Sequence, residues 1–206
     1  MKNYFLIVAL LIAVVAQAKR PVMQTWYVGE ITLLNNEVLE RELRYDAYTD
    51  LIQVKENGTI KVYSARQVSS FAFFDVYSNS KRQFVSLLYT TRFKKSRVFF
   101  ENIISGELNL IRKARSAGAA RRIVEETKDA WFDTHNVYDY YIYTDNQFIS
   151  TKQFFKEVYE RIMVEFKQPL DIFIKSRNIN INTQFGQFVL INQYNILKNS
   201  ATVGYF

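Results

Sequence analysis

Apolar and polar residues alternate through the first half of the chain, and this pattern predicts short β-strands. The clearest case spans residues 51–64, where two alternating runs flank Asn57-Gly58. Asn-Gly suits the two positive-φ positions of a tight hairpin turn, so we expect a β-hairpin here. We expect one face of this hairpin to carry the apolar residues Ile52, Val54, Ile60 and Val62. The opposite face would carry Gln53, Lys55 and Lys61.

Similar runs recur on both sides of this hairpin, without a helical period between them. The further strands are expected at 26–34, 37–45, 68–76, 82–90, 97–105 and 107–113. Such a succession predicts an antiparallel meander that closes as a sandwich, a rolled sheet or a small barrel. Arg41 falls on an otherwise apolar face, which indicates either a β-bulge or a position at the rim of the sheet.

The pattern changes to a helical period at Ser150, which forms a capping-box pattern with Gln153. A first helix is expected to end at Gln168-Pro169, where a second begins and runs to about Arg177. The apolar stripe of the first helix would contain Phe154, Phe155, Val158, Ile162, Met163 and Phe166. A third helix, 184–198, is expected to bury Phe185, Phe188, Val189 and Ile196. The predicted fold class is therefore α+β, an antiparallel β-meander with two to three C-terminal helices.

The chain divides into four parts on these patterns. Residues 1–18 have a short positive start, an apolar run over 4–15 and the small-x-small site Ala16-Gln17-Ala18, which are typical of a signal peptide. Residues 19–114 form the β-domain. The small and weakly periodic residues of 115–136 predict a flexible excursion, and 137–206 hold a hairpin around Asp145-Asn146 and the helices.

The signal peptide predicts export across an inner membrane, to the periplasm, the outer membrane or the medium. We expect no transmembrane segment in the mature chain, because no later stretch is long and apolar enough to span a bilayer as a helix. The chain has no cysteine, which excludes thiol catalysis and a lipidated N-terminus, and fits a bacterial envelope protein held together by its core.

Positive charge is concentrated in the middle of a chain whose formal net charge is +7. Residues 81–122 contain eleven basic and two acidic side chains. Alternate loops of a meander lie at one end of the sheet, so part of this charge is expected to form one binding surface. The candidate binding residues are Arg92, Lys94, Lys95, Arg97, Arg112, Lys113 and Arg115. The expected partner is an anionic envelope glycan or lipid rather than nucleic acid, which is scarce there. The alternative is a solvated basic rim that opposes edge-to-edge pairing.

Two groups of segments resemble uncharacterised secreted proteins of Bacteroidetes. The first comprises Gly29-Glu30-Ile31, Tyr45-Asp46, the Asn57-Gly58 hairpin, Ala65-Arg66-Gln67-Val68 and the aromatic run 71–75. The second comprises Tyr140-Tyr141-Ile142, Ile174-Lys175, Asn178-Ile179-Asn180 and Tyr194-Asn195-Ile196-Leu197. The resemblance implies an exported location and this β-then-helix architecture, and it assigns no activity.

Catalytic chemistry has few candidates in this sequence. A single His135, with Asp129 and Asp133 nearby, is too little for a zinc site, so we expect no metal and no cofactor. Asp46, Asp50 and Asp75 could serve a glycosidase as paired carboxylates, although Asp at strand ends commonly caps turns. The sequence therefore predicts an exported envelope protein with a non-enzymatic binding or structural role. The alternative is a glycan-active or cell-wall-active hydrolase that uses these Asp residues.

Overall fold

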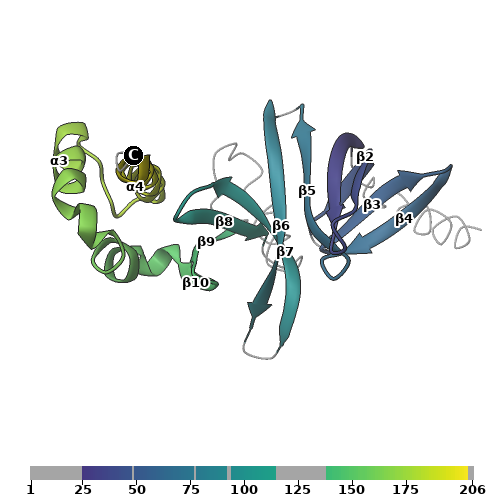
Figure 1. Ribbon diagram of the computed structural model, residues 1–206, viewed down its shortest axis with the longest axis horizontal. Helices are drawn as coiled ribbons and strands as arrows, with labels where there is room; N and C mark the ends of the chain where they lie inside the picture. Colours follow the sequence, from purple (N-terminus) through teal and green to yellow (C-terminus); the bar gives the residue numbers. More distant parts are fainter. Residues whose placement is uncertain (1–24, 48, 77, 92–93, 115–137, 204–206) are drawn as a thin grey trace, which may run out of the picture.

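A ten-stranded antiparallel sheet followed by a helical C-terminal part makes up the fold, which confirms the predicted α+β class (Figure 1). The computed structural model describes residues 25–47, 49–76, 78–91, 94–114 and 138–203. The expected signal peptide, the excursion 115–136 and His135 lie outside the described residues.

The strands follow one another along the sheet, except that β1 lies between β2 and β5. The order is β10-β9-β8-β7-β6-β5-β1-β2-β3-β4. The strands are β1 (Tyr27–Leu33), β2 (Val38–Asp46), β3 (Leu51–Glu56), β4 (Thr59–Ser64), β5 (Val68–Asp75), β6 (Ser80–Thr90), β7 (Lys95–Ile104), β8 (Asn109–Ala114), β9 (Tyr138–Thr144) and β10 (Gln147–Ser150).

The predicted hairpin turns are present at their expected positions. Asn57 and Gly58 have φ values of 49° and 76°, and Asp145 and Asn146 have 47° and 60°. Two successive positive φ values define the type I′ turn, whose twist matches that of the flanking strands. Asn36 also has a positive φ, 68°, in the turn between β1 and β2.

The predicted apolar face of the β3–β4 hairpin was wrong. The two-residue turn pairs Ile52 with Tyr63 and Val54 with Lys61, so Ile60 and Val62 lie on the opposite face. Ile52 and Val54 are fully buried, whereas Ile60 and Val62 are more than half exposed. The apolar run of β4 therefore does not indicate its core-facing side.

The sheet is rolled and does not close into a barrel. Only residues 65–67 connect β4 to β5, although β1, β2 and β3 lie between these strands in the sheet. Four strand spacings would cover about 19 Å in a flat sheet, whereas the chain from Ser64 to Val68 reaches at most about 14 Å. The sheet must therefore curl to bring the end of β4 to the start of β5, where Leu34 N donates to Gln67 O.

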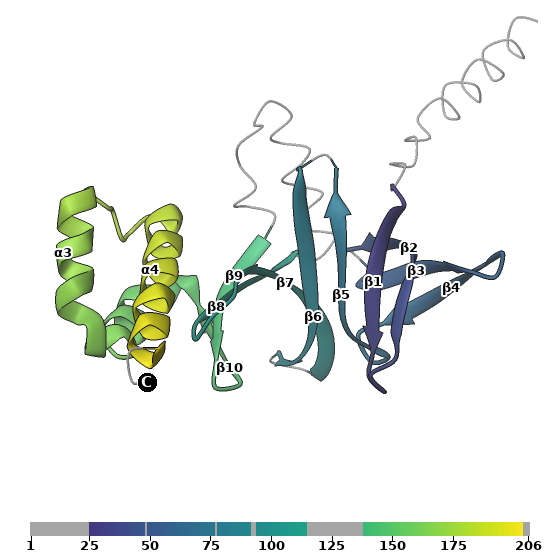
Figure 2. The same cartoon turned by 45° about the horizontal axis from the view of Figure 1, so that its top comes forward.

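Two hydrophobic cores form in succession along the chain. The first lies inside the roll, and its buried members are Ile31, Leu43, Ile52, Val54, Ala65, Val68, Phe71, Phe73, Phe84 and Phe99. The second lies between β8–β10 and the helices, with Leu108, Leu110, Tyr140, Ile142, Phe154, Val158, Tyr159, Met163, Leu170, Leu190, Ile191 and Tyr194. Figure 2 shows the helices at the β8–β10 end of the sheet and β1–β4 at the other end.

The first predicted helix is not a continuous α-helix. Ser150 accepts from the N–H of Lys152 and begins a 3-10 turn, η2 (Thr151–Gln153). A π-helical segment, η3 (Phe154–Tyr159), and a second 3-10 turn, η4 (Met163–Phe166), follow. The predicted apolar stripe is only partly buried, because the wider π turn turns Phe155 out to 50% exposure while Phe154, Val158 and Tyr159 are buried.

The second and third helices are α3 (Lys167–Arg177) and α4 (Gln184–Val203). Pro169 lies in the first turn of α3, where a missing N–H costs little, and Asn178 ends the helix in the left-handed conformation. The buried face of α4 was partly mispredicted: Phe185 and Ile196 are exposed, while Leu190, Ile191 and Tyr194 are buried. None of the helices in the described ranges combines the length and hydropathy needed to cross a bilayer.

The amide of buried Asn195 joins α4 to the sheet. It accepts from Leu108 N at 3.0 Å and donates to Leu108 O at 2.9 Å. Gly106 permits this contact, since a Cβ at this position would lie 2.4 Å from the Asn195 side chain.

Arg41 lies in an uninterrupted stretch of the β1–β2 ladder, which rules out a bulge at this position. It pairs with Gly29, is exposed, and donates to Glu40 O. The neighbouring backbone explains the glycine, because a Cβ on Gly29 would lie 2.4 Å from Ala72 O.

Candidate functional site

Four of the seven predicted basic residues fall into two separate places. Lys94 and Lys95 are exposed at the β6–β7 hairpin, where Thr91 N donates to Lys94 O. Arg112 and Lys113 lie at the end of β8. Arg92 and Arg115 are outside the described residues.

Arg97 supports the sheet with its guanidinium group. Nη1 donates to the carbonyl of Ser86 at 2.8 Å and to its hydroxyl at 3.3 Å. Ser86 in turn donates to Ala65 O at 2.6 Å in the β4–β5 link. Arg97 thus helps to hold the roll through Nη1, while the residue itself stays exposed.

Arg112 belongs to a charged ladder between the two hydrophobic cores. Its Nε lies 2.7 Å from Oε2 of Glu101, whose Oε1 lies 2.7 Å from Nε of Arg82. Arg82 also lies 3.7 Å from Asp75. Burial raises the pKa of the Glu101 carboxyl, but hydrogen bonds from Arg82 and Arg112 outweigh it, so its pKa lies below the ordinary value.

Lys113 pairs with Asp50, at 3.3 Å from Oδ1. Asp50 also accepts from the Tyr45 hydroxyl at 2.9 Å and from Phe99 N at 3.2 Å. Arg112 and Lys113 thus face carboxylates. The positive charges of Arg82, Arg112 and Lys113 are matched by the negative charges of Asp50, Asp75 and Glu101. This part of the predicted basic surface has little charge left for an external anion.

The same ion pairs bear on the hydrolase alternative. Asp50 and Asp75 are both held by basic side chains, and Asp46 accepts from Thr49 N at 3.4 Å. The void beside the ladder, lined by Tyr45, Glu101 and Arg112 among others, measures about 10 Å³. It has room for about one water molecule and none for a sugar ring.

An aromatic groove of about 580 Å³ lies between the β6–β7 and β9–β10 hairpins. Its lining residues are Leu88, Tyr89, Thr90, Lys95, Tyr141, Tyr143, Asn146, Phe148, Ser150 and Gln153. Of the candidate basic residues that the structure describes, Lys95 is thus the one that lines this groove. Lys94, its neighbour in sequence, does not line this groove.

Phe148 is the centre of the aromatic cluster. Its ring centroid lies 5.1 Å from those of Tyr89 and Phe100, 4.9 Å from Tyr143 and 6.1 Å from Tyr141. The hydroxyls of Tyr89 and Tyr141 are 3.0 Å apart, although β7 and β8 separate their strands. The sheet therefore bends here, and the rings meet over the buried Phe100.

Successive side chains of β9 point to opposite faces of the sheet, so its tyrosines lie on both faces. Tyr141 and Tyr143 point to the face of Phe148, and Tyr138 and Tyr140 to the face of the helices. Tyrosines on both faces of 138–143 were a sequence signal for this cluster, but pairing with Tyr89, more than fifty residues earlier, had no local signature. None of these tyrosines was predicted from the sequence as a site residue.

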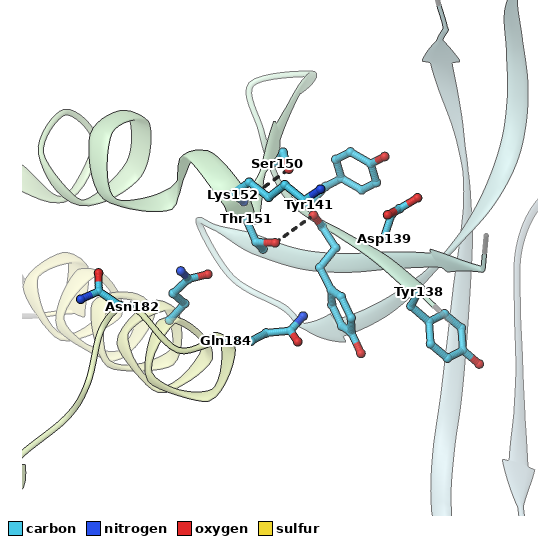
Figure 3. A pocket seen from close by; sticks show the side chains of 10 residues that line it. Tyr138, Asp139, Tyr141, Ser150, Thr151, Lys152, Asn182 and Gln184 are labelled. Atoms are coloured by element: carbon cyan, nitrogen blue, oxygen red, sulfur yellow. Dashed lines mark hydrogen bonds between the residues drawn. The ribbon is translucent and has the colours of Figure 1, made fainter. Parts of the chain in front are cut away.

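A second cavity, the amide pocket, lies where β9 extends past β10 (Figure 3). It measures about 480 Å³ and is lined by Tyr138, Asp139, Tyr140, Tyr141, Ser150, Thr151, Lys152, Asn182, Gln184 and Gln187. Because β10 pairs only with residues 141–144, the earlier part of β9 meets η2 instead, through Thr151 Oγ1 and Tyr140 O at 3.4 Å. Three side-chain amides come from α4 and the residues before it.

Within the described ranges, no three His, Cys, Asp or Glu side chains gather in a way that could hold a metal ion.

Comparison of the chain with protein-family models, with curated proteins and with solved structures finds no match.

Proposed function

We propose that this is an exported envelope protein that binds an anionic glycan without catalysis, in the aromatic groove beside Lys95. The observation that carries the proposal is the lining of the groove. One cavity combines an exposed ammonium group, tyrosine and phenylalanine rings, and the amides of Asn146 and Gln153.

These groups match the two surfaces of a sugar acid. The C–H face of a sugar ring is apolar and slightly positive, and it packs on the negative face of an aromatic ring. The sugar hydroxyls both donate and accept hydrogen bonds, as do amide and tyrosine side chains. A carboxylate on the sugar would form a charge-assisted hydrogen bond to the Lys95 ammonium.

The lining favours a glycan over the acyl chains of a lipid. Tyr143 donates to Asn146 Oδ1 at 2.9 Å, and the Asn146 and Gln153 amides line the groove together with the rings. Hydrocarbon chains would cover the Asn146 and Gln153 amides without offering them new hydrogen bonds, at a cost of about 1–3 kcal/mol for each polar group left unpaired. A sugar provides hydroxyls for them.

The contacts of the other candidate basic residues reduce the number that are free to bind the ligand. Arg112 and Lys113 face Glu101 and Asp50, and Arg97 is hydrogen-bonded to the sheet. Among the candidate basic residues that the structure describes, the charge available to a ligand is thus that of Lys94, Lys95 and Arg97, and of these Lys95 lines the groove. In this proposal Lys95 contacts the ligand, whereas Lys94 contributes only a screened, longer-range attraction.

The test is the affinity of purified protein for polygalacturonate, measured at about 0.15 M salt, where non-specific attraction is weakened. We expect Lys95→Gln to weaken binding about tenfold and Lys94→Gln to weaken it less than about threefold, because both remove one charge but only Lys95 lines the groove. Lys81→Glu with Lys156→Glu, two exposed lysines elsewhere, controls for net charge against Lys94→Glu with Lys95→Glu.

Two results would overturn the proposal. One is equal loss in the hairpin variant and in the charge control, which would make retention a property of net charge. The other is binding to vesicles of anionic phospholipid that depends on Lys95, with no binding to polygalacturonate, which would identify a lipid headgroup as the ligand.

A further inference from the structure

The aromatic groove and the amide pocket meet at one cross-strand pair. Tyr141 of β9 and Ser150 of β10 are register partners, and both residues line both cavities. Among the described residues, no other lines both cavities. The cavities therefore lie on either side of the point where β10 ends and η2 begins.

We infer that the ligand is a linear glycan chain that occupies both cavities, crossing from the aromatic groove past Tyr141 and Ser150 into the amide pocket. This inference rests on the proposed function and adds that the protein recognises an extended chain rather than a single sugar or a terminal headgroup.

The amide pocket has the chemistry of a subsite for a hydroxyl-rich part of such a chain. Asn182, Gln184 and Gln187 each offer a donor and an acceptor on one side chain. Figure 3 shows Gln184 on the α4 side of the pocket, while Thr151 and Lys152 lie on the η2 side. One acid and one base, Asp139 and Lys152, add no net charge.

The two cavities differ in what they select. The groove supplies rings and the Lys95 charge, and the pocket supplies neutral hydrogen-bonding groups. Both volumes, about 580 and 480 Å³, are in the usual range of small-molecule sites. A chain held in the groove presents its next sugars to the pocket at high effective concentration, so filling the pocket adds affinity.

The experiment measures affinity for size-fractionated oligogalacturonates, from the dimer to the octamer, by titration calorimetry at about 0.15 M salt. We expect the dissociation constant of the wild type to fall at least about tenfold with length and then to level off once both cavities are filled. A continuous fall without a plateau would indicate length-dependent charge attraction and would overturn the inference.

The decisive variant is Gln184→Ala with Gln187→Ala, which changes no charge. We expect this variant to bind the dimer with the wild-type affinity. Its affinity should not increase for the longer oligomers. Asn192→Ala with Asn199→Ala, two exposed amides elsewhere on α4, is the matched control and should keep the wild-type length dependence. Equal melting temperatures establish that the variants are folded.

The outcomes separate this inference from the proposed function. If the Gln184 and Gln187 variant keeps the wild-type length curve while Lys95→Gln weakens every oligomer, the chain-length inference fails and the proposed function stands. If Lys95→Gln changes the affinity for no oligomer, the proposed function fails and the inference fails with it.

Discussion

The carboxylate of Asp50 lies 3.3 Å from the ammonium group of Lys113, although four strands separate β2 from β8 in the sheet. Asp50 precedes β3 with a positive φ of 59°, and its second oxygen accepts from Phe99 N. One turn residue thus ties the first hairpins to β7 and β8 and holds the sheet in its rolled form.

Replacement of Asp50 by Asn tests this tie. Asn tolerates the positive φ and keeps the volume, so Asp50→Asn removes chiefly the charge. We expect the free energy of unfolding to fall by about 1–2 kcal/mol, measured by urea denaturation. Asp145→Asn, at an exposed turn position with a similar φ, should change it by less than about 0.5 kcal/mol. Equal effects of the two would show that Asp50 is an ordinary turn residue.

Glu101 should make stability depend on acid pH. Its folded-state pKa is lowered, so its contribution is present above the unfolded-state pKa and is lost as the pH falls through the folded-state pKa. Glu101→Gln is expected to destabilise the protein by about 3–5 kcal/mol at pH 7, because it leaves Arg82 and Arg112 without their shared carboxylate. The difference from the wild type should shrink in urea titrations at decreasing pH below about 4.5. A constant difference would contradict the linkage.

Two valines of one hairpin give a matched test of the β3–β4 register. Val54 is fully buried and Val62 is 51% exposed, although both were predicted to share a face. We expect Val54→Ala to cost about 2 kcal/mol of unfolding free energy through lost burial and a cavity. Val62→Ala should cost about 0.5 kcal/mol, mainly through lower β-propensity. The reverse order in thermal or urea unfolding would mean that the hairpin has slipped by one residue.

Asn195 should be far more sensitive than other asparagines of α4. Asn195→Ala leaves both backbone groups of Leu108 buried without partners, with an expected loss of about 2–4 kcal/mol. Asn195→Asp keeps the acceptor but brings a carboxylate oxygen against Leu108 O, and is expected to be similarly harmful at pH 7. Asn192→Asp, on the exposed side of the helix, serves as the control in urea denaturation and should be nearly neutral.

Local sequence signals located most of the strands and turns correctly. Asn57-Gly58 and Asp145-Asn146 determine their turns through backbone preferences that act within a few residues. The same local reasoning failed at the faces of β4, since two alternating apolar runs were assumed to be in phase. A two-residue turn pairs residues of opposite parity, and that count overrides the similarity of the runs.

The helical part shows a second limit of periodicity. A regular 3.6-residue repeat would bury Phe154 and Phe155 on adjacent positions of one stripe, whereas the π-helical turn separates them. Phe185 and Ile196 were also expected in the core but are exposed. The apolar pattern of α4 does not show which of its faces meets the sheet.

The candidate site was predictable only in part. The concentration of basic residues led to Lys95, but not to the separation of Lys95 from Arg112 and Lys113. Glu101, one of the two acidic residues in that segment, is surrounded by two of the basic ones, and Asp50 comes from another hairpin. Which charges remain available depends on such long-range pairs, and net charge does not reveal them. The exported location and the likeness to secreted Bacteroidetes proteins stay predictions.

The two cores also set an order in time. Every buried member of the first core lies between Ile31 and Phe99, and every member of the second lies between Leu108 and Tyr194. Because a chain emerges from the ribosome N-terminus first, all the described residues of the first core become available to pack before those of the second core appear. We expect β7 to offer a template on which β8 to β10 can add, with the Asp50–Lys113 ion pair forming as β8 joins the sheet.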